Sequence, residues 1–354
     1  MAVSPHKGRG AVSAPDGRFS RQSVELDDEY DWEQAQVAPE TVLRAMQAGR
    51  IIAENQSPDV PFSRSINPYQ GCEHGCVYCY ARPSHSYLDL SPGLDFETRI
   101  FYKPNAAKRL LESWEKPGYD VKPITIGANT DPYQPAERKT RVTRELVELF
   151  VRHQHPLNII TKGTLIERDI DLLSSLAKHR LCSVAVSLPT LDPVLKRIME
   201  PRVPSATARL KTVERLSDAG IPVYVLTAPM IPAINDHELE SLLDAAKAAG
   251  AGGAAYIFLR LPHEVSGLFQ DWLNSHFPER ASHVMSLVRQ SSGGRDYDNR
   301  FGHRQTGQGA YAKLLAARFR VACKKRGLTE GEYQQVLDTS RFIRPGAQQL
   351  GLGF

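Results

Sequence analysis

Six short apolar runs recur along the middle of the chain, and a stretch with helical periodicity separates each run from the next. The runs span residues 63–67, 124–129, 157–161, 183–188, 223–228 and 254–259. A strand followed by a helix, repeated in this way, favours a parallel sheet with right-handed crossovers. Six such units are too few to close an eight-stranded barrel. The sequence therefore predicts an α/β fold built on a parallel sheet.

Residues typical of helix ends mark several boundaries between these runs. Asp192 is followed by proline, which is the pattern of an N-cap with proline at the first helical position. Ser205 is expected to begin a helix that Gly220 ends. Asn235 and Glu238 have the polar pairing of a capping box. We therefore prefer a helix start here to a metal cluster formed by Asp236, His237 and Glu238.

Three of the five cysteines lie within eight residues, at Cys72, Cys76 and Cys79, with the spacing C-x3-C-x2-C. Clustered thiolates are the usual ligands of iron–sulfur clusters. Three of them can hold three irons of a [4Fe-4S] cluster and leave the fourth iron without a protein ligand. Gly71 and Gly75 flank the first gap, where glycine lets the backbone turn tightly. The loop therefore predicts a metal centre with one open position, where chemistry can take place.

Two other interpretations of the cysteines are less favoured. A structural Cys3His zinc site would need His74 or His85 as its fourth ligand, but His74 would have to bend back on its own neighbours. Zinc sites of this kind also usually pair two short knuckles, and no second C-x2-C occurs. A structural disulfide requires an oxidising compartment. The first residues carry charge but no apolar segment of a secretory signal, which favours a cytoplasmic protein.

Composition sets only broad limits on function. The chain of 354 residues has a formal net charge of +4, which is compatible with nucleic acid but is not evidence for it. No apolar stretch is long enough to span a membrane. These properties are typical of a globular enzyme without a membrane partner, and we expect a monomer.

Polar residues follow several of the predicted strands. Asn129, Thr130 and Asp131 follow the second run, Lys162 follows the third, and Ser187 lies at the end of the fourth. In strand–helix repeats of this kind, functional residues lie at the carboxyl ends of the strands. The cysteine loop directly follows the first run, so we expect these polar side chains to face it.

The cysteine spacing, with Tyr78 just before the third cysteine, resembles the signature of the radical S-adenosylmethionine (radical SAM) superfamily. Residues 129–132, 161–162 and 200–201 resemble the spore photoproduct lyase-like branch, and the likeness runs from about residue 63 to 261. This resemblance implies a partial (β/α)6 barrel that binds a [4Fe-4S] cluster and S-adenosylmethionine. It also implies reductive cleavage of that cofactor to a 5′-deoxyadenosyl radical, which abstracts hydrogen from a substrate. Such an enzyme takes its electron from a reductant such as flavodoxin or ferredoxin.

The resemblance also suggests which residues contact the cofactor. It implies that Tyr78 lies beside the adenine and that Lys162 pairs with the carboxylate, since a charge-assisted hydrogen bond is strong in a dry site. Arg202 is expected to serve the same anion or a substrate phosphate. The full set expected to bind the cofactor is Tyr78, Asn129, Thr130, Lys162, Ser187 and Arg202.

One position departs from the pattern of the branch. The lyase carries a cysteine that returns a hydrogen atom to the substrate radical, and the matching position here is Ala128. Alanine cannot donate a hydrogen atom, so the same repair by the same route is not expected. Phenols can donate hydrogen atoms, although a structural role is the first expectation for each tyrosine that qualifies. Those tyrosines are Tyr80, Tyr133 and Tyr256.

The sequence leaves the substrate open. Damaged DNA or another nucleic acid is the leading hypothesis, and modification of tRNA or of a protein is the alternative within the same chemistry. A non-catalytic, zinc-stabilised binding module is a third hypothesis, from a different functional class.

The regions outside the repeats suggest accessory roles. We divide the chain into an N-terminal tail that is flexible or draped on the domain (1–45), the catalytic core (46–264), a helical cap (265–340) and a C-terminal tail (341–354). The last residues resemble the short peptide that binds the bacterial DNA sliding clamp, an apolar segment of a kind that docks in a groove. The residues that carry this resemblance are Gln349, Leu350, Leu352 and Phe354.

Overall fold

The computed structural model of the chain describes residues 8–19, 40–331 and 336–346, so the predicted clamp-binding residues lie outside the described ranges. The six predicted strands are β3 (Arg64–Ile66), β6 (Ile124–Ile126), β7 (Leu157–Thr161), β8 (Cys182–Ser187), β9 (Val223–Met230) and β10 (Gly253–Phe258). They are neighbours in chain order in one sheet, and every pair is parallel. The predicted α/β fold is confirmed.

Two short strands that the sequence did not predict extend this sheet to eight strands. β11 (Thr329–Glu330) pairs in parallel with β10, and β2 (Ile52–Glu54) pairs antiparallel with β3. β2 and β11 are the two ends of the strand order, so the sheet is open rather than closed into a barrel. Each has only two or three residues, too few to show a strand periodicity.

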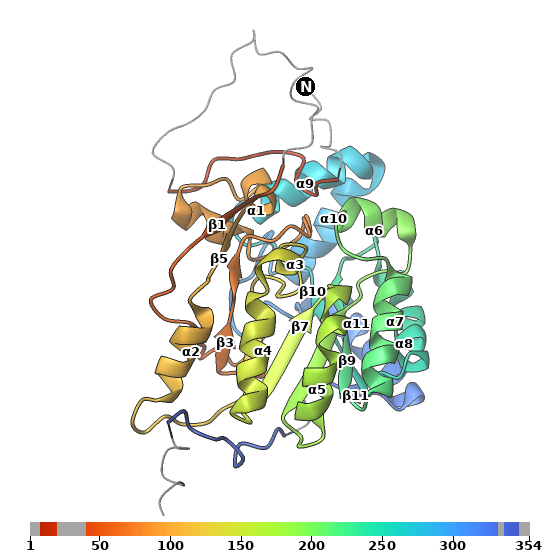
Figure 1. Cartoon of the computed structure of the whole chain (residues 1–354). Coiled ribbons are helices and arrows are strands. Elements are labelled where there is room, and N and C mark those ends of the chain that lie inside the picture. Colours follow the sequence, from red (N-terminus) through yellow and green to blue (C-terminus); the bar gives the residue numbers. More distant parts are fainter. Residues whose placement is uncertain (1–7, 20–39, 332–335, 347–354) are drawn as a thin grey trace, which may run out of the picture.

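Amphipathic helices connect the strands and cover the outer face of the sheet (Figure 1). The connecting helices are α2 (Ala106–Trp114), α3 (Glu137–Thr140), α4 (Val142–Arg152), α5 (Ile170–Ala177), α6 (Pro193–Met199), α7 (Ala206–Asp218) and α8 (Leu239–Ala248). Leu146 and Leu243 on these helices pack with Ile159 and Val184 of the strands in the main core. Since every crossover joins parallel neighbours, the carboxyl ends of the six strands all face the same way.

The helix ends confirm most of the predicted caps. The Asp192 carboxylate accepts hydrogen bonds from the first backbone N–H groups of α6, and the Ser205 hydroxyl caps α7. Gly220 follows α7 with a φ of +75°, a conformation that favours glycine. The capping box at Asn235 and Glu238 was wrong. Asn235 accepts from the Ile231 N–H, and Glu238 accepts from the Leu191 N–H (both 2.7 Å), so these side chains fasten the loops after β8 and β9.

A second, three-stranded sheet lies beside the cysteine loop and was not predicted. It contains β1 (Val42–Ala45), β4 (Tyr69–Gln70) and β5 (Arg99–Tyr102) in the order β1-β5-β4. β4 comes just before Cys72, and α1 (Leu94–Thr98) leads into β5. A 3-10 helix, η2 (Arg82–Leu88), follows the cysteines. The loop is thus anchored by a strand at its start and a helix at its end.

The C-terminal extension is helical, as expected, and packs against the cysteine loop. It contains α9 (Val265–His276), α10 (Pro278–Ser291) and α11 (Gly309–Arg326). In Figure 1, α9 and α10 lie at the same end of the molecule as α1 and α6. Phe269 and Trp272 of α9 and Val288 of α10 share a second apolar core with Val77 and Tyr78.

Two further 3-10 turns are η3 (Thr164–Asp169) and η4 (Asp236–Glu238). No helix in the described ranges is long and apolar enough to cross a bilayer.

Candidate active site

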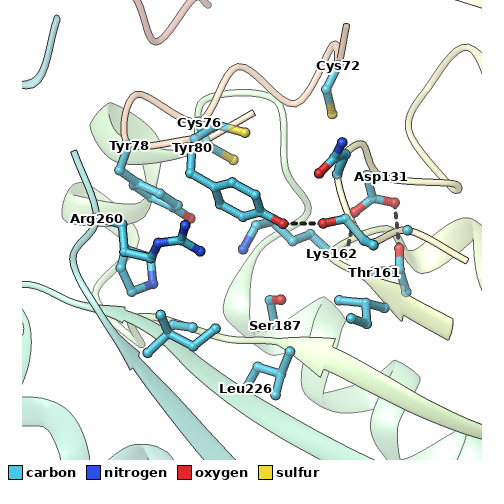
Figure 2. A pocket seen from close by; sticks show the side chains of 18 of the residues that line it. Cys72, Cys76, Tyr78, Tyr80, Asp131, Thr161, Lys162, Ser187, Leu226 and Arg260 are labelled. Carbon is cyan, nitrogen blue, oxygen red and sulfur yellow. Dashed lines mark hydrogen bonds between the residues drawn. The ribbon is translucent and has the colours of Figure 1, made fainter. Parts of the chain in front are cut away.

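A cavity of about 190 Å³ lies between the cysteine loop and the carboxyl ends of the strands (Figure 2). Seven of the nine residues predicted for the site line it, namely Cys72, Cys76, Tyr78, Cys79, Asn129, Lys162 and Ser187. Four separate parts of the chain thus meet in one place, because the parallel strands end at a common edge.

The other two predicted residues lie outside this lining. Thr130 is buried, and its hydroxyl donates to the carbonyl of Tyr69 (2.9 Å), so it joins the strand end to β4. Arg202 pairs with Glu73 on the cysteine loop, with 3.3 Å between Nη2 and Oε1. Both residues therefore hold the cysteine loop rather than face the cavity.

Glycine shapes the cysteine loop, as the sequence predicted. Gly71 and Gly75 have φ angles of +80° and +67°. A Cβ on Gly75 would lie 2.6 Å from the carboxylate of Glu97, so a side chain there would displace a buried acid. The loop is therefore tight both in its backbone turn and in its packing.

A buried ion pair holds the loop on its far side. Arg82 and Glu97 are both fully buried and pair with each other, and the Arg82 Nε donates to the carbonyl of Cys76 (3.0 Å). The Glu97 carboxylate also accepts from the backbone N–H groups of Gly10 (3.0 Å) and Ala11 (2.8 Å). A charge removed from water in this way is stable only when it is paired and hydrogen-bonded, and Glu97 meets both conditions.

The N-terminal segment is therefore part of the loop's support. Ala11 and Val12 are buried, and a Cβ on Gly10 would lie 1.7 Å from the carbonyl oxygen of Gly75. Residues 8–19 thus lie against the domain. This segment is a short run of mostly small residues, and its sequence contains no pattern that predicts the contact.

The loop after β6 supports the cysteines from the cavity side. Gln134 is buried and bridges the loop, accepting from the Glu73 N–H (2.9 Å) and donating to the Gly71 carbonyl (3.2 Å). Asp131 accepts from the Thr161 hydroxyl and the Lys162 N–H (both 2.6 Å) and faces His74 at 3.3 Å. Burial acts to raise the pKa of Asp131, but His74 and these hydrogen bonds hold that pKa below its usual value.

Glu200 connects the loop with two strand ends. It is fully buried, and its carboxylate contacts the Tyr78 hydroxyl, the Lys162 ammonium (3.2 Å) and the Arg209 guanidinium (2.8 Å). Burial acts to raise the pKa of Glu200, yet Arg209 and Lys162 lower it to about 2. Arg209 also donates to the Ser187 carbonyl (2.8 Å). Glu200 is thus an anion around which the polar side of the cavity is arranged.

The opposite side of the cavity is aromatic and apolar. The Arg260 guanidinium lies over the ring of Tyr80 (4.8 Å to the centroid) and donates to the Tyr297 hydroxyl (3.2 Å). The Tyr80 hydroxyl in turn donates to the carbonyl of Ala128 (Figure 2). The remaining apolar lining comes from Val60, Phe62, Ile160, Leu226, Ile257 and Phe258. The sequence analysis missed Arg260 and Tyr297. Arg260 directly follows the sixth predicted run but was not singled out, and Tyr297 lies far along the chain from any predicted strand.

The three tyrosines considered as hydrogen donors have different positions. Tyr80 lines the cavity. Tyr133 is buried outside the lining, and its hydroxyl donates to Asp169 (3.0 Å). Tyr256 packs against Phe319 of α11, with ring centroids 4.9 Å apart. Of these three phenols, Tyr80 alone faces the space where a substrate could bind.

Comparison with known families identifies the class of this site. The model of the radical SAM superfamily matches residues 66–246, which is more than half of the chain and includes the cysteine loop and the strand ends. The chain belongs to the radical SAM superfamily. It is therefore a radical SAM enzyme, and the non-catalytic zinc module left open by the sequence is at odds with this membership.

Relatives of this radical SAM enzyme occur in bacteria and archaea. An uncharacterized protein of Mycobacterium tuberculosis is 38% identical over 232 residues, covering 65% of this chain and 68% of the relative. An uncharacterized protein of Methanocaldococcus jannaschii is 27% identical over 214 residues, covering 60% of this chain and 76% of the relative.

Solved structures share the fold at low sequence identity. A single-residue mutant of spore photoproduct lyase has a TM-score of 0.60 at 14% identity, and the match covers 89% of this chain and 88% of the lyase. Spore photoproduct lyase complexed with dinucleoside spore photoproduct has a TM-score of 0.59 at 15% identity and covers 81% of each chain. These matches support the fold expected from the sequence.

Superfamily membership implies an iron–sulfur cluster and S-adenosylmethionine, and the cavity suits both. Burial raises the pKa of each of the three thiols, so a bound cation is needed before they are held as thiolates. No group of three or more His, Cys, Asp or Glu side chains in the described ranges is arranged around a single metal ion. A cluster presents its irons separately, so its cysteines need to face a common space rather than one point, as these three do.

The predicted fourth ligands of a zinc site are placed poorly for that role. His85 Nε2 faces the carbonyl of Arg99 at 3.0 Å, and His85 does not line the cavity. His74 lines the cavity, but its Nδ1 faces Asp131. The soft donors that line the cavity are the three thiols, which suits iron–sulfur chemistry.

Proposed function

We propose that this radical SAM enzyme binds a [4Fe-4S] cluster through Cys72, Cys76 and Cys79 and acts on a nucleic-acid substrate. When bound, the cluster supplies the electron that cleaves S-adenosylmethionine into methionine and a 5′-deoxyadenosyl radical, which abstracts hydrogen from the substrate. The observation that carries this proposal is that all three cysteines line the same cavity as Lys162 and Tyr78.

The chain's own residues bind and orient the cofactor in this proposal. Lys162 places an ammonium in the cavity, which suits a carboxylate, while Glu200 fixes its position. The Tyr78 ring lies near the same ammonium (5.6 Å) and offers a flat face to a purine. Ser187 at the end of β8 and Asn129 after β6 supply polar atoms on either side of β7. Thr130 and Arg202 act indirectly, because they hold the cysteine loop in place. Thr130 does so through its hydrogen bond to Tyr69, and Arg202 through its ion pair with Glu73.

The apolar side of the cavity protects the chemistry. Leu226, Ile160 and Phe62 leave little for water to hydrogen-bond, so a reactive carbon radical is kept from solvent. Ala128 adds no side-chain hydrogen donor beside them. The Tyr80 hydroxyl, which reaches the Ala128 carbonyl, is held by that bond at the edge of the same space.

Nucleic acid is the substrate class favoured by two observations. The structural match includes spore photoproduct lyase complexed with dinucleoside spore photoproduct, which shows that a related fold accepts nucleic-acid bases. In the present chain, Tyr80 and Arg260 give the cavity a cationic and aromatic side, with Tyr297 behind Arg260, and bases stack well on such surfaces. Damaged DNA is the first substrate to test, with tRNA and protein as alternatives.

The test is anaerobic reconstitution with iron and sulfide, followed by reduction with dithionite or with flavodoxin or ferredoxin. We expect 5′-deoxyadenosine and methionine in equal amounts, and a Cys76→Ala protein that forms neither. Deuterium-labelled DNA, tRNA and protein pools are then supplied separately. Deuterium should appear in 5′-deoxyadenosine only with the DNA pool. Product formation by the Cys76→Ala protein would refute the cluster assignment, and transfer from the tRNA or protein pool alone would change the substrate class.

A further inference from the structure

A second cavity, of about 600 Å³, lies between strands β2 and β3 of the main sheet and helix α2. Its charged lining contains five cations and two carboxylates, an excess of three positive charges. The cations are Arg50, Arg64, Lys103, Arg109 and Lys116, and the carboxylates belong to Glu54 and Glu112. We call this cavity the basic groove.

Two of the five cations are already occupied by protein groups. Arg109 pairs with Glu112 at 2.8 Å. Arg64 donates to the backbone carbonyl of Asp120 and lies 4.0 Å from its carboxylate. The side chains of Arg50 and Lys116 form no hydrogen bond or ion pair with any residue in the described ranges. Their charge is therefore open to a ligand.

Lys103 is the most informative of the five. Its ammonium donates to the backbone carbonyl of Asn67 at 2.7 Å, and no carboxylate in the described part of the chain pairs with it. Burial lowers the pKa of Lys103, because it disfavours the charged form of the amine. Holding a charged ammonium at the groove therefore reduces the free energy of unfolding. An ammonium has three donors, and an anion in the groove would satisfy those that remain.

Asn67 links the basic groove to the candidate active site. Its backbone carbonyl accepts from Lys103, while its side-chain oxygen accepts from the N–H of Asn129 (2.8 Å). Asn129 lines the active-site cavity and Asn67 lines the groove. Asn67, which follows the carboxyl end of β3, therefore lies between the two cavities.

We propose that the basic groove binds the phosphodiester backbone of a nucleic-acid strand that places one of its nucleotides in the active-site cavity. This inference rests on the proposed nucleic-acid substrate and adds the place where the strand is held. Cations spread over separate parts of the chain, from Arg50 to Lys116, suit a chain of phosphates better than a single anion. Tyr119 lies in the same lining, with Arg64 over its ring at 5.2 Å, and adds an aromatic side chain beside the cations.

The test measures binding of a fluorescent single-stranded oligonucleotide to the full-length reconstituted protein by anisotropy, as a function of salt. The groove variant is Arg50→Gln, Lys103→Gln and Lys116→Gln. The matched control removes the same charge from the exposed residues of α11, with Lys313→Gln, Lys324→Gln and Lys325→Gln. We expect the groove variant to bind at least tenfold more weakly. The slope of log affinity against log salt should fall by about 2, since each lost phosphate contact contributes about 0.7.

The outcomes separate the groove from the substrate class. Equal losses in both variants, or no loss in the groove variant, overturn the groove assignment while leaving the proposed function standing. If the wild-type protein forms 5′-deoxyadenosine but binds no oligonucleotide, the nucleic-acid substrate itself is wrong. Competition by millimolar inorganic phosphate as strong as that by oligonucleotide phosphate would indicate a single-anion site and would also overturn the strand proposal. Should Lys103→Gln reduce folding, the Arg50→Gln, Lys116→Gln double variant is measured, with an expected loss of at least threefold.

Discussion

The two ends of the sheet bury polar side chains in opposite ways. At the carboxyl end, Glu200 is fully buried among two cations and a phenol. At the amino end, His155 is equally buried, but it stacks on Trp114 at 4.8 Å and bonds the Tyr119 hydroxyl at 2.9 Å. Buried ion pairs contribute little net stability, whereas buried aromatic rings contribute a great deal. The comparison suggests that the carboxyl end orients groups for chemistry and that the amino end stabilises the fold.

The largest effect on chemistry is expected from Glu200→Ala. This change leaves the buried Arg209 guanidinium without its anion and frees Lys162 and Tyr78 from their common partner. Loss of one partner of a buried pair costs about 3–5 kcal/mol of unfolding free energy. We also expect the KM for S-adenosylmethionine to rise more than tenfold, as measured by 5′-deoxyadenosine formation. An unchanged KM in the fraction that remains folded would show that Glu200 serves stability alone.

Trp114→Ala is the matching change at the amino end. Trp114 is fully buried and contacts Phe150, His155 and Phe342 through its ring. Removing such a side chain costs about 3–5 kcal/mol, so urea unfolding should shift as far as for Glu200→Ala. The yield of 5′-deoxyadenosine per folded, cluster-loaded molecule should stay at the wild-type value. A change in KM comparable to that of Glu200→Ala would break the proposed separation between the two ends.

Lys162→Met removes the charge from the cavity but keeps most of the apolar stem. Hydrogen bonds to charged groups contribute about 1.5–3 kcal/mol, so the KM for S-adenosylmethionine should rise about 10- to 100-fold. The unfolding free energy should change less than in Glu200→Ala, because Arg209 and Tyr78 still satisfy Glu200. Lys211→Met in α7 is the matched control: its exposed cation lies outside the cavity lining, and the KM should change little.

Gly10→Val tests the support that lies behind the cysteine loop. The new side chain would collide with the carbonyl oxygen of Gly75, which a Cβ alone approaches to 1.7 Å. We expect faster loss of iron to a chelator, by several-fold, with the circular dichroism of the fold unchanged. Gly267→Ala in α9 is the control, since a Cβ there meets no atom within 4 Å. Equal iron release from the two variants would show that the N-terminal segment does not hold the loop.

The sequence predicted the parts of this site that depend on short-range patterns. The parallel strands, the glycine turns beside Cys72 and Cys76, and the polar strand ends all follow from local periodicity and spacing. Arg82 and Glu97 were missed because their pairing is a tertiary contact between residues that look like ordinary surface charges in the sequence. Arg202 was expected to serve the cofactor carboxylate or a substrate phosphate, and in the structure its guanidinium pairs with Glu73, a tertiary contact that the sequence does not reveal.

The smallest expected effect concerns pH at the amino end. Burial lowers the pKa of His155 to about 3, compared with about 6.5 in an unfolded chain. Because the unfolded state takes up this proton first, stability should fall as the pH drops from about 6.5 toward 3, by about 1–2 kcal/mol at pH 5. His155→Phe keeps the ring against Trp114 without the titration, so its urea midpoint should decline less between pH 7 and pH 5. If both proteins lose stability in parallel, a group other than His155 causes the acid sensitivity. Glu200 at the carboxyl end would not be that group, because its pKa of about 2 keeps it ionised between pH 7 and pH 5.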